Sequence, residues 1–377
     1  MILFLDVETS THNKGHPFDP RNKLVSYSYA CDSESSVNFV YYSDPDFKRR
    51  LLDVLESASE LVGFNIKFDL HWICRWTGYT PRANQRIWDC MLAEYIYTGQ
   101  QSGFKSLNDT LSSYGLPVKK DIVAEYWEQG ISTEAIPYSV VEEYNNWDVE
   151  TTRLLYWTQL KLLSERQQSL VYLSGQDLLT LQAAEYAGIK FDVEEADRVL
   201  SVNRRIVDDC TKFLAGFLPT FPDGFVFNWD SGDHLSAFLY GGTLTYNHAD
   251  PEERIYKTGP NKGQTYIRNK WTEFKIVFDQ LFLPLEDTEV AKSKDKENVP
   301  KFYQTDEPTL LQLKGKTKTH KEILDALRKR AAHTKIVEMC ESVINKMKEK
   351  NWVDDYIHGQ FNQVAVITGR LSSSGPY

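Results

Sequence analysis

The sequence predicts an α/β domain over residues 1–168, followed by a mainly α-helical domain over residues 169–377. Two observations predict this division. Up to about residue 160, short apolar runs of strand length alternate with amphipathic helical patterns, which is typical of α/β domains. Beyond that point the apolar residues recur mostly at helical spacing. A chain of 377 residues, 41% of them hydrophobic, is long enough for two or three domains with their own cores.

Four apolar runs in the first domain have the length and composition of strands. They are ILFLDV (2–7), KLVSYSYAC (23–31), NFVYY (38–42) and ELVGFN (60–65). Between the third and fourth runs, the segment DFKRRLLDVLESA has helical spacing. A longer helix is expected to run from Ser139 to about Gln168, because Glu142 follows Ser139 by three residues and completes a capping box.

The second domain is expected to consist of helices around a central section of weaker pattern. One helix should stop at Gly188, and another should start within FDVEEADRVL (191–200). The pattern weakens over residues 245–306. There, residues 258–270 are expected to form a hairpin or a loop, and residues 291–301 a mobile charged excursion.

Carboxylates in apolar or aromatic surroundings are the most informative feature of the first domain. Asp6 and Glu8 lie two residues apart on the first expected strand, so that their side chains point to the same face. Asp69 lies one turn inside a helix that is expected to begin at Asn65. Asp148 completes the set on the long helix. A buried carboxylate is unfavourable unless a positive charge offsets it, and divalent cations would do so here.

Oxygen ligands without a cluster of His or Cys favour Mg²⁺ or Mn²⁺ over zinc. Two such ions can hold the attacking and leaving oxygens of a phosphodiester. Tyr144 precedes Asp148 by one helical turn and would orient the attacking water. Each motif alone has a plainer interpretation, such as a solvated strand or a helix cap, and only their conjunction favours the metal site. We expect Asp89 to cap the following helix and His71 to be a core or rim residue.

Composition and charge limit the class of protein further. No apolar run is long enough to span a membrane and no leader pattern opens the chain, so the sequence predicts a cytoplasmic protein. The five cysteines are scattered, which favours reduced thiols. The net charge is −10, yet residues 314–350 hold eleven Lys or Arg against five acids. That segment is either a solvated helix face or a surface that follows phosphates.

The order of motifs resembles the tyrosine-containing branch of the DEDD superfamily of 3′-to-5′ exonucleases. The motifs are Asp6-Val-Glu8, Asn65-Ile-Lys-Phe68-Asp69 and Tyr144-Asn-Asn-Trp-Asp148. The resemblance implies a ribonuclease-H-like fold, with two ions held by the four carboxylates at the 3′ end of single-stranded DNA. It also implies DNA contacts from Asn65 and Phe68. Phe68 or Trp72 would offer a base-stacking surface, although either aromatic could instead belong to the core.

Three later segments resemble family A DNA polymerases of the bacterial DNA polymerase I type. They are LLTLQAAEYAGIKFD (178–192), FNWDSGDHLSAFLYGG (227–242) and HGQFNQVAVITGRLSSSGP (358–376). The resemblance implies a proofreading exonuclease for DNA replication joined to a thumb, an arrangement common in phage polymerases. By analogy Arg370, with Thr368 and Ser372, would lie beside the primer backbone of primer-template DNA. His234 departs from the family pattern, in which glutamine is usual.

The chain stops where family members continue into the palm and fingers. A trimmed sequence, a truncated gene and one half of a split polymerase would each give this ending. We favour the split polymerase, in which a separate chain carries the palm and fingers. Two other functions stay open: an RNA exonuclease of the same superfamily, and a mainly non-catalytic subunit that clamps DNA and assembles with the other half.

Overall fold

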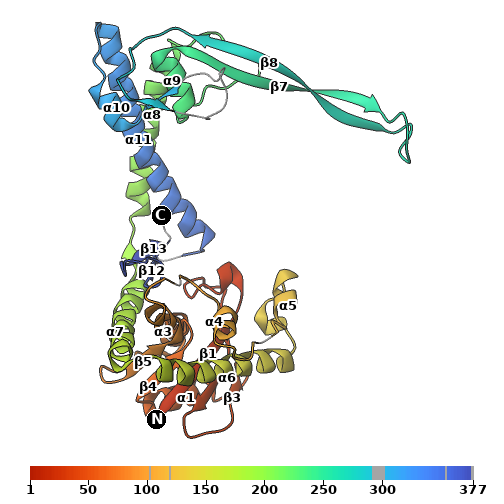
Figure 1. Cartoon of the computed structure of the whole chain (residues 1–377), viewed down its shortest axis with the longest axis vertical. Helices are drawn as coiled ribbons and strands as arrows, with labels where there is room; N and C mark the ends of the chain where they lie inside the picture. Colours follow the sequence, from red (N-terminus) through yellow and green to blue (C-terminus); the bar gives the residue numbers. More distant parts are fainter. Residues whose placement is uncertain (102, 119, 291–301, 353–354, 375–377) are drawn as a thin grey trace. The chain divides into compact units, whose positions relative to one another are not determined.

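The computed structural model describes residues 1–101, 103–118, 120–290, 302–352 and 355–374. The chain divides into two compact units (Figure 1). The first unit comprises Met1–Val193 together with Glu341–Tyr377, and the second comprises Glu194–Cys340. No helix among the described residues is long and apolar enough to cross a membrane.

A five-stranded mixed sheet is the centre of the first unit. Its strands are β1 (Ile2–Thr9), β2 (Leu24–Cys31), β3 (Asn38–Tyr41), β4 (Glu60–Gly63) and β5 (Arg86–Asp89), in the spatial order β3-β2-β1-β4-β5. β1 pairs antiparallel with β2 and parallel with β4, so it lies in the middle. The four expected strands are confirmed. β5 was not expected, because a four-residue run ending in an acid gives a weak periodic signal.

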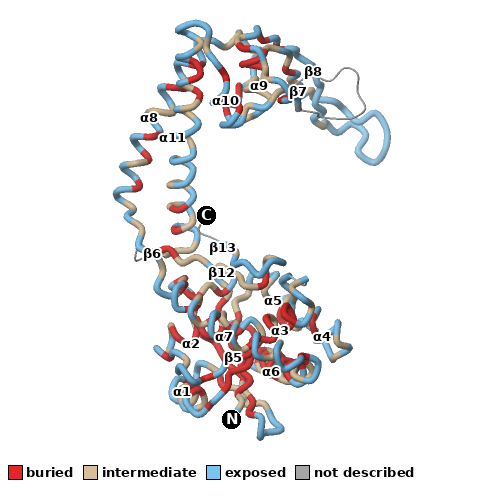
Figure 2. The backbone as a smooth tube through the Cα atoms, turned by 60° about the vertical axis from the view of Figure 1, so that its left-hand side comes forward, coloured by how far each residue is buried: buried red, intermediate tan, exposed pale blue. Residues whose placement is uncertain are grey.

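Helices cover this sheet. They are α1 (Phe47–Ser57), α2 (Ile66–Thr77), α3 (Cys90–Tyr97), α4 (Leu107–Ser113), α5 (Ala124–Glu128), α6 (Tyr138–Leu162) and α7 (Glu165–Ala187). α6 packs along β1 to β4 and α7 packs on β5. The buried core includes Phe4, Leu61, Trp72 and Trp88, each fully enclosed. Buried positions concentrate on the sheet and the helices that cover it (Figure 2). The fold is the expected α/β, ribonuclease-H-like arrangement.

Both expected ends of the long helix are corrected by the structure. α6 begins at Tyr138 behind an extended Pro137, and no side chain caps it. Ser139 is therefore already inside the helix and cannot act as its cap. The helix ends at Leu162, because Leu163 is extended and Ser164 is already the N-cap of α7. The capping box is formed there instead, by Ser164 and Gln167.

The C-terminal residues of the chain return to the first unit. The short strand β6 (Ile189–Lys190) pairs antiparallel with β11 (Tyr356–Ile357), and β12 (Gln360–Asn362) pairs with β13 (Ser372–Ser374). Gly188 ends α7 with a φ of 67°, and an added Cβ would lie 2.8 Å from the His358 ring. The expected break at Gly188 is confirmed, and α8 (Val193–Ala215) starts within the expected segment.

The second unit combines helices with one long hairpin. Its helices are most of α8, α9 (Gly232–Tyr240), α10 (Glu307–Gln312) and most of α11 (Lys318–Glu349). Its strands are β7 (Gly242–Ile255), β8 (Thr265–Phe278), β9 (Glu289–Val290) and β10 (Phe302–Tyr303). The core is aromatic, with Phe227, Trp229 and Phe238 buried together. The expected hairpin is confirmed, with strands of 14 residues each. The charged excursion expected at residues 291–301 lies outside the described residues.

Candidate active site

β1 and α6 bring three of the expected carboxylates together. Asp6 and Glu8 point to the same side of β1, and Asp148 comes from the middle of α6. One oxygen from each carboxylate lies within 4.8 Å of the others. Glu8 is 9% exposed and Asp148 is 7% exposed, whereas Asp6 is half-buried, so water reaches this group of acids mainly at Asp6. We call Asp6, Glu8 and Asp148 the acidic group.

Asp69 reaches the same strand from α2. Its Oδ1 accepts a hydrogen bond of 3.0 Å from the backbone N–H of Val7, which lies between Asp6 and Glu8. The residue is 3% exposed. Burial raises the pKa of Asp69 well above its usual range, and the nearby charge of Asp6 raises it further. The acid is thus held at the edge of the acidic group in surroundings that disfavour its ionised form.

Tyr144 lies one turn before Asp148 on the same helix, as the sequence predicts. Its ring packs edge-on against Trp127, with the two ring centroids 5.8 Å apart. Burial raises the pKa of Tyr144 far above 10, and the charges of Glu8 and Asp148 act in the same direction. The phenol therefore stays protonated at neutral pH and can donate a hydrogen bond to an oxygen.

Asn145 is a site residue that the sequence did not reveal. It is fully buried. Its Nδ2 donates to Asp6 Oδ2 at 2.7 Å, and the Ser26 hydroxyl donates to Asn145 Oδ1 at 3.2 Å. A neutral amide thus fixes one carboxylate without cancelling its charge. An asparagine beside the motif tyrosine gives no signal in the sequence, because its partner lies 139 residues away.

Asn65 and Asp89 connect α2 to α3. Asn65 is the N-cap of α2 in a left-handed conformation with φ of 57°, and its side chain does not cap the helix. Its backbone N–H donates to Asp89 Oδ1 at 2.9 Å, and the same oxygen accepts the Met91 N–H at 2.9 Å. Asp89 is therefore the expected cap of α3. Its complete burial raises its pKa to about 6.

The base-stacking surface suggested for Trp72 is not supported by the structure. Trp72 is fully buried, and its indole N–H donates to the carbonyl of Gly15 at 3.0 Å. Both faces of the ring are enclosed, so Trp72 is a core residue. Phe68 is only partly buried and lines a cavity. His71 is buried as expected, with Nε2 2.7 Å from Glu185 Oε2.

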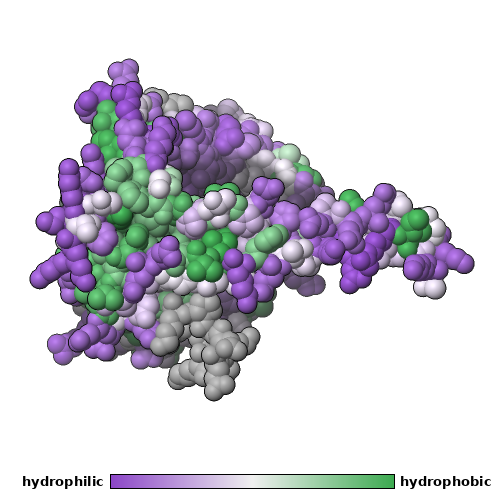
Figure 3. Space-filling view, turned by 90° about the horizontal axis from the view of Figure 1, so that it is seen from above, coloured by the Kyte–Doolittle hydropathy of each residue, from purple (hydrophilic) through white to green (hydrophobic). Residues whose placement is uncertain are grey.

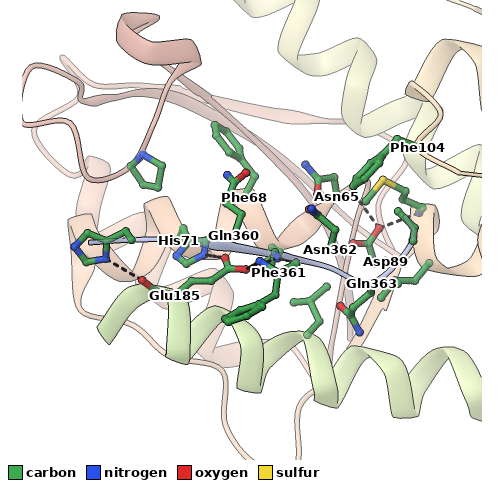
Figure 4. Close-up of a pocket in the computed structure, with 18 of the residues that line it drawn as sticks. Asn65, Phe68, His71, Asp89, Phe104, Glu185, Gln360, Phe361, Asn362 and Gln363 are labelled. Atoms are coloured by element: carbon green, nitrogen blue, oxygen red, sulfur yellow. Dashed lines mark hydrogen bonds and ion pairs between the residues drawn. The ribbon is translucent and has the colours of Figure 1, made fainter. Parts of the chain in front are cut away.

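A cavity of about 150 Å³ lies beside α2. Asn65 and Phe68 line one part of it (Figure 4). Gln360 and Asn362 line another part and belong to residues 358–374, which we call the C-terminal stretch. The stretch is held in place by Glu185, whose Oε1 accepts both the Lys67 ammonium and the Phe361 N–H, each at 2.6 Å. Residues that the sequence associates with the exonuclease motifs and with the polymerase-like stretch thus share one cavity.

The three residues expected beside a primer lie at the end of this stretch. Thr368 and Arg370 are exposed, and Ser372 pairs with Asn362 between β13 and β12. Tyr95 Oη donates to the carbonyl of Val366 at 2.6 Å, which attaches the segment to α3. That Thr368, Arg370 and Ser372 contact DNA stays a prediction.

Residues 5–163 match the family model of a 3′-5′ exonuclease domain of the DNA polymerase A type. This part of the chain carries a 3′-5′ exonuclease domain. The matched range contains Asp6, Glu8, Asp69, Tyr144 and Asp148. No curated protein matches the chain.

A solved polymerase structure shares the fold. The POL domain of Pol1 from M. smegmatis, solved in complex with DNA primer-template and dNTP, is similar with a TM-score of 0.61 and 17% identity. The match covers 99% of this chain and 51% of that chain, so the chain spans about half the length of the Pol1 domain. Brucella melitensis NrnC bound to pGG is a weaker neighbour, with a TM-score of 0.39, 16% identity and coverage of 48% of this chain and 83% of that one.

Proposed function

We propose that the chain is a 3′-to-5′ exodeoxyribonuclease that hydrolyses the terminal phosphodiester of a single-stranded DNA 3′ end and releases nucleoside 5′-monophosphates. The observation that carries this proposal is the meeting of Asp6, Glu8 and Asp148 within 4.8 Å, inside an exonuclease domain. In the proposal Asp6, Glu8, Asp69 and Asp148 hold two Mg²⁺ or Mn²⁺ ions, directly or through water.

The residues present fit such ions. Carboxylate oxygens at this separation repel one another, and a divalent cation offsets that repulsion. Burial and, after it, the charge of Asp6 raise the pKa of Asp69, and a nearby cation would offset both effects. The donor set consists of oxygens alone, which suits Mg²⁺ or Mn²⁺.

In the proposed reaction, the bound ions and the surrounding side chains would have different roles. Bound cations would supply Lewis-acid stabilisation of the phosphate charge and would favour ionisation of the attacking water. The Tyr144 hydroxyl, which stays protonated, would orient that water. Asn145 fixes the Asp6 carboxylate by a hydrogen bond of 2.7 Å. Asn65 and Phe68 would shape the pocket for the terminal nucleotide.

Digestion of a 5′-labelled single-stranded DNA with Mg²⁺ tests the proposal. The wild type should shorten the strand from its 3′ end, and Asp6→Ala should lose at least about 100-fold of that rate, because a ligand of the reacting centre is removed. Asp53→Ala is the matched control, since Asp53 is an exposed residue of α1. If the wild type and Asp6→Ala were equally inert, the exonuclease function would be contradicted, and the non-catalytic subunit that clamps DNA would be favoured.

The same assay with an RNA of matching sequence separates DNA from RNA as substrate. We expect faster digestion of DNA, because residues 358–376 resemble a DNA polymerase segment. Faster digestion of RNA would make the chain an RNA exonuclease of the same superfamily.

We further propose that this exonuclease proofreads for a DNA polymerase of family A. The support is the resemblance of residues 358–376 to a stretch of those polymerases. Digestion of a primer-template duplex with a mismatched or a paired 3′ end tests this proposal. The mismatched end should be removed faster, because a paired end must first unpair at a cost of a few kcal/mol. Equal rates for the two ends would contradict proofreading.

A further inference from the structure

The hairpin of β7 and β8 extends well beyond the core that holds it. The pairing runs without interruption from Gly242 opposite Phe278 to Ile255 opposite Thr265. Near its base, Leu244, Ile276 and Phe278 are buried in the second unit. Farther out most residues are exposed (Figure 2). A two-stranded ribbon has no second layer to bury its distal half, so its side chains are available to a ligand.

The outer part of the hairpin is strongly basic. Residues 254–270, which we call the hairpin tip, contain no Asp or Glu. Their cations are Arg254, Lys257, Lys262, Arg268 and Lys270. The tip therefore carries a charge of +5 within a chain of net charge −10. Figure 3 shows the hairpin as a mainly hydrophilic projection with apolar atoms near its end.

Most of this charge has no local partner. Arg254 and Lys270 lie 3.0 and 3.9 Å from Glu252. Within the described part of the chain, Lys257, Lys262 and Arg268 have no carboxylate within 4.0 Å.

The basic helix α11 differs from the tip in this respect. Its Arg330 lies 2.8 Å from Asp230 and its Lys335 lies 3.1 Å from Glu307. The positive charge of α11 is thus partly offset by neighbouring acids, whereas that of the tip is available to an anionic ligand.

Aromatic and glycine residues accompany the cations. The rings of Tyr256 and Tyr266 are 4.4 Å apart at the start of the turn. Gly259 and Gly263 have φ of 86° and 91° and open space around them, so the turn carries little bulk. Exposed cations, aromatic rings and a slender turn are the combination that contacts a nucleic-acid backbone.

We propose that the hairpin tip binds the phosphate backbone of double-stranded DNA, independently of base sequence. The major groove of B-form DNA, about 12 Å wide, admits a two-stranded β-ribbon. Lys257, Lys262 and Arg268 would each neutralise a phosphate and release a counterion. This inference goes beyond the proposed exonuclease, because it assigns a second DNA contact to the second unit and requires no hydrolysis.

The test measures binding of a fluorescein-labelled DNA duplex by anisotropy between about 50 and 200 mM KCl, the range over which phosphate contacts change affinity most visibly. All proteins carry Asp6→Ala, and EDTA is present, so that binding is measured without cleavage. The tip variant combines Lys257→Gln, Lys262→Gln and Arg268→Gln. The matched control combines Lys48→Gln, Lys161→Gln and Arg166→Gln, which removes the same charge from exposed positions of the first unit.

Three lost phosphate contacts should reduce the slope of log K against log salt by about 2.7, and affinity at about 0.1 M salt should fall on the order of 100-fold. The control should change both values much less. Replacing residues 256–264 by Asn-Gly gives a second variant that keeps the paired strands and should also bind weakly. Circular dichroism confirms that each variant is folded.

Equal slopes and affinities for the tip variant and the control would overturn the proposal. A loss confined to single-stranded DNA would overturn the assignment to duplex. Neither outcome depends on nuclease activity, so failure of the exonuclease proposal and failure of this one are distinguishable.

Discussion

Asp69 is held in an unfavourable state when no cation is present. Its carboxylate is 3% exposed, and burial and Asp6 both raise its pKa. Asp69→Asn keeps an oxygen that can accept the Val7 N–H while removing the charge. We expect the variant to melt about 2–4 °C higher in EDTA, because about 1 kcal/mol shifts the melting temperature of a unit of this size by that amount. It should lose exonuclease activity.

Scanning calorimetry of both proteins in EDTA measures this difference. With Mg²⁺ added, the advantage of Asp69→Asn should shrink, because the ionised wild-type acid then gains a partner. A variant that melts below the wild type in EDTA would show that Asp69 is not under electrostatic strain.

Asp89 should make stability depend on pH. Burial raises its folded-state pKa to about 6, above that of the unfolded chain. Its contribution is therefore fully present below about pH 4 and is lost as the pH rises through about 6. Relative to Asp89→Asn, the wild-type free energy of unfolding in EDTA should fall by up to about 3 kcal/mol between about pH 4 and 7.

Urea unfolding of both proteins at the two ends of this pH range tests the expectation. The amide introduced by Asp89→Asn would retain an oxygen for the N–H groups of Asn65 and Met91, so the comparison isolates the charge. The expectation would be contradicted if the difference in free energy of unfolding between the two proteins were the same at both pH values.

Residue patterns revealed the acids but not their supporting contacts. Asp6 with Glu8 and Tyr144 with Asp148 follow the periods of a strand and a helix, so the sequence alone predicts that each pair shares a face. Burial of Trp72 and the bond from Asn145 to Asp6 depend on tertiary packing, which a local pattern does not contain.

At the scale of elements, Glu185 joins three of them. Its carboxylate, on α7, accepts hydrogen bonds from the Lys67 ammonium of α2 and from the Phe361 N–H of β12. It also contacts the His71 ring of α2. Burial alone would raise the pKa of Glu185, but the bonds from His71 and Lys67 outweigh it and hold the pKa below its usual value. Glu185→Gln should destabilise the first unit by about 3–5 kcal/mol, because Lys67 is left largely buried without a counter-charge.

Chemical denaturation measures this loss, and limited proteolysis within residues 358–374 should accelerate as β12 loosens. Glu195→Gln is the control, since its ion pair with Arg198 is exposed and worth little. Similar stability of the two variants would mean that Glu185 does not hold the C-terminal stretch.

Element boundaries were harder to predict than the elements. Ser139 and Ser164 both lie three residues before a Glu or Gln, yet only Ser164 forms the box, because Pro137 and the extended Leu163 decide where the helices begin and end. The length of the hairpin was also missed. Its strands are mostly polar, and polar strands lack the apolar alternation that marks a half-buried sheet.

For the whole molecule, the two units should respond differently to metal. Heating should melt the two compact units in separable transitions, and Mg²⁺ should raise only the transition of the first unit. At a concentration about 100 times Kd the gain is about 2.7 kcal/mol, which is a shift of several degrees. Hydrogen exchange by mass spectrometry assigns each transition to its residues. Asp6→Ala should remove the shift, and a shift of the second unit's transition would contradict the metal site.

The net charge of the whole chain and its local periodicity do not reveal how charge and long-range contacts are distributed. A net charge of −10 gives no sign of a hairpin tip of +5. Likewise, periodicity could not show that β11 pairs with β6, because the pairing joins segments that are far apart in the sequence. The fold class followed from local patterns, whereas the return of residues 341–374 to the first unit required long-range contacts.

Anomalous diffraction from crystals soaked in Mn²⁺ would locate the ions of the acidic group. Manganese peaks are expected within bonding distance of carboxylate oxygens of Asp6, Glu8 and Asp148 in the wild type, and they should be lost in Asp6→Ala. The metal site would be contradicted if the wild-type protein degraded DNA in the presence of Mn²⁺ while its soaked crystals showed no peak at these carboxylates.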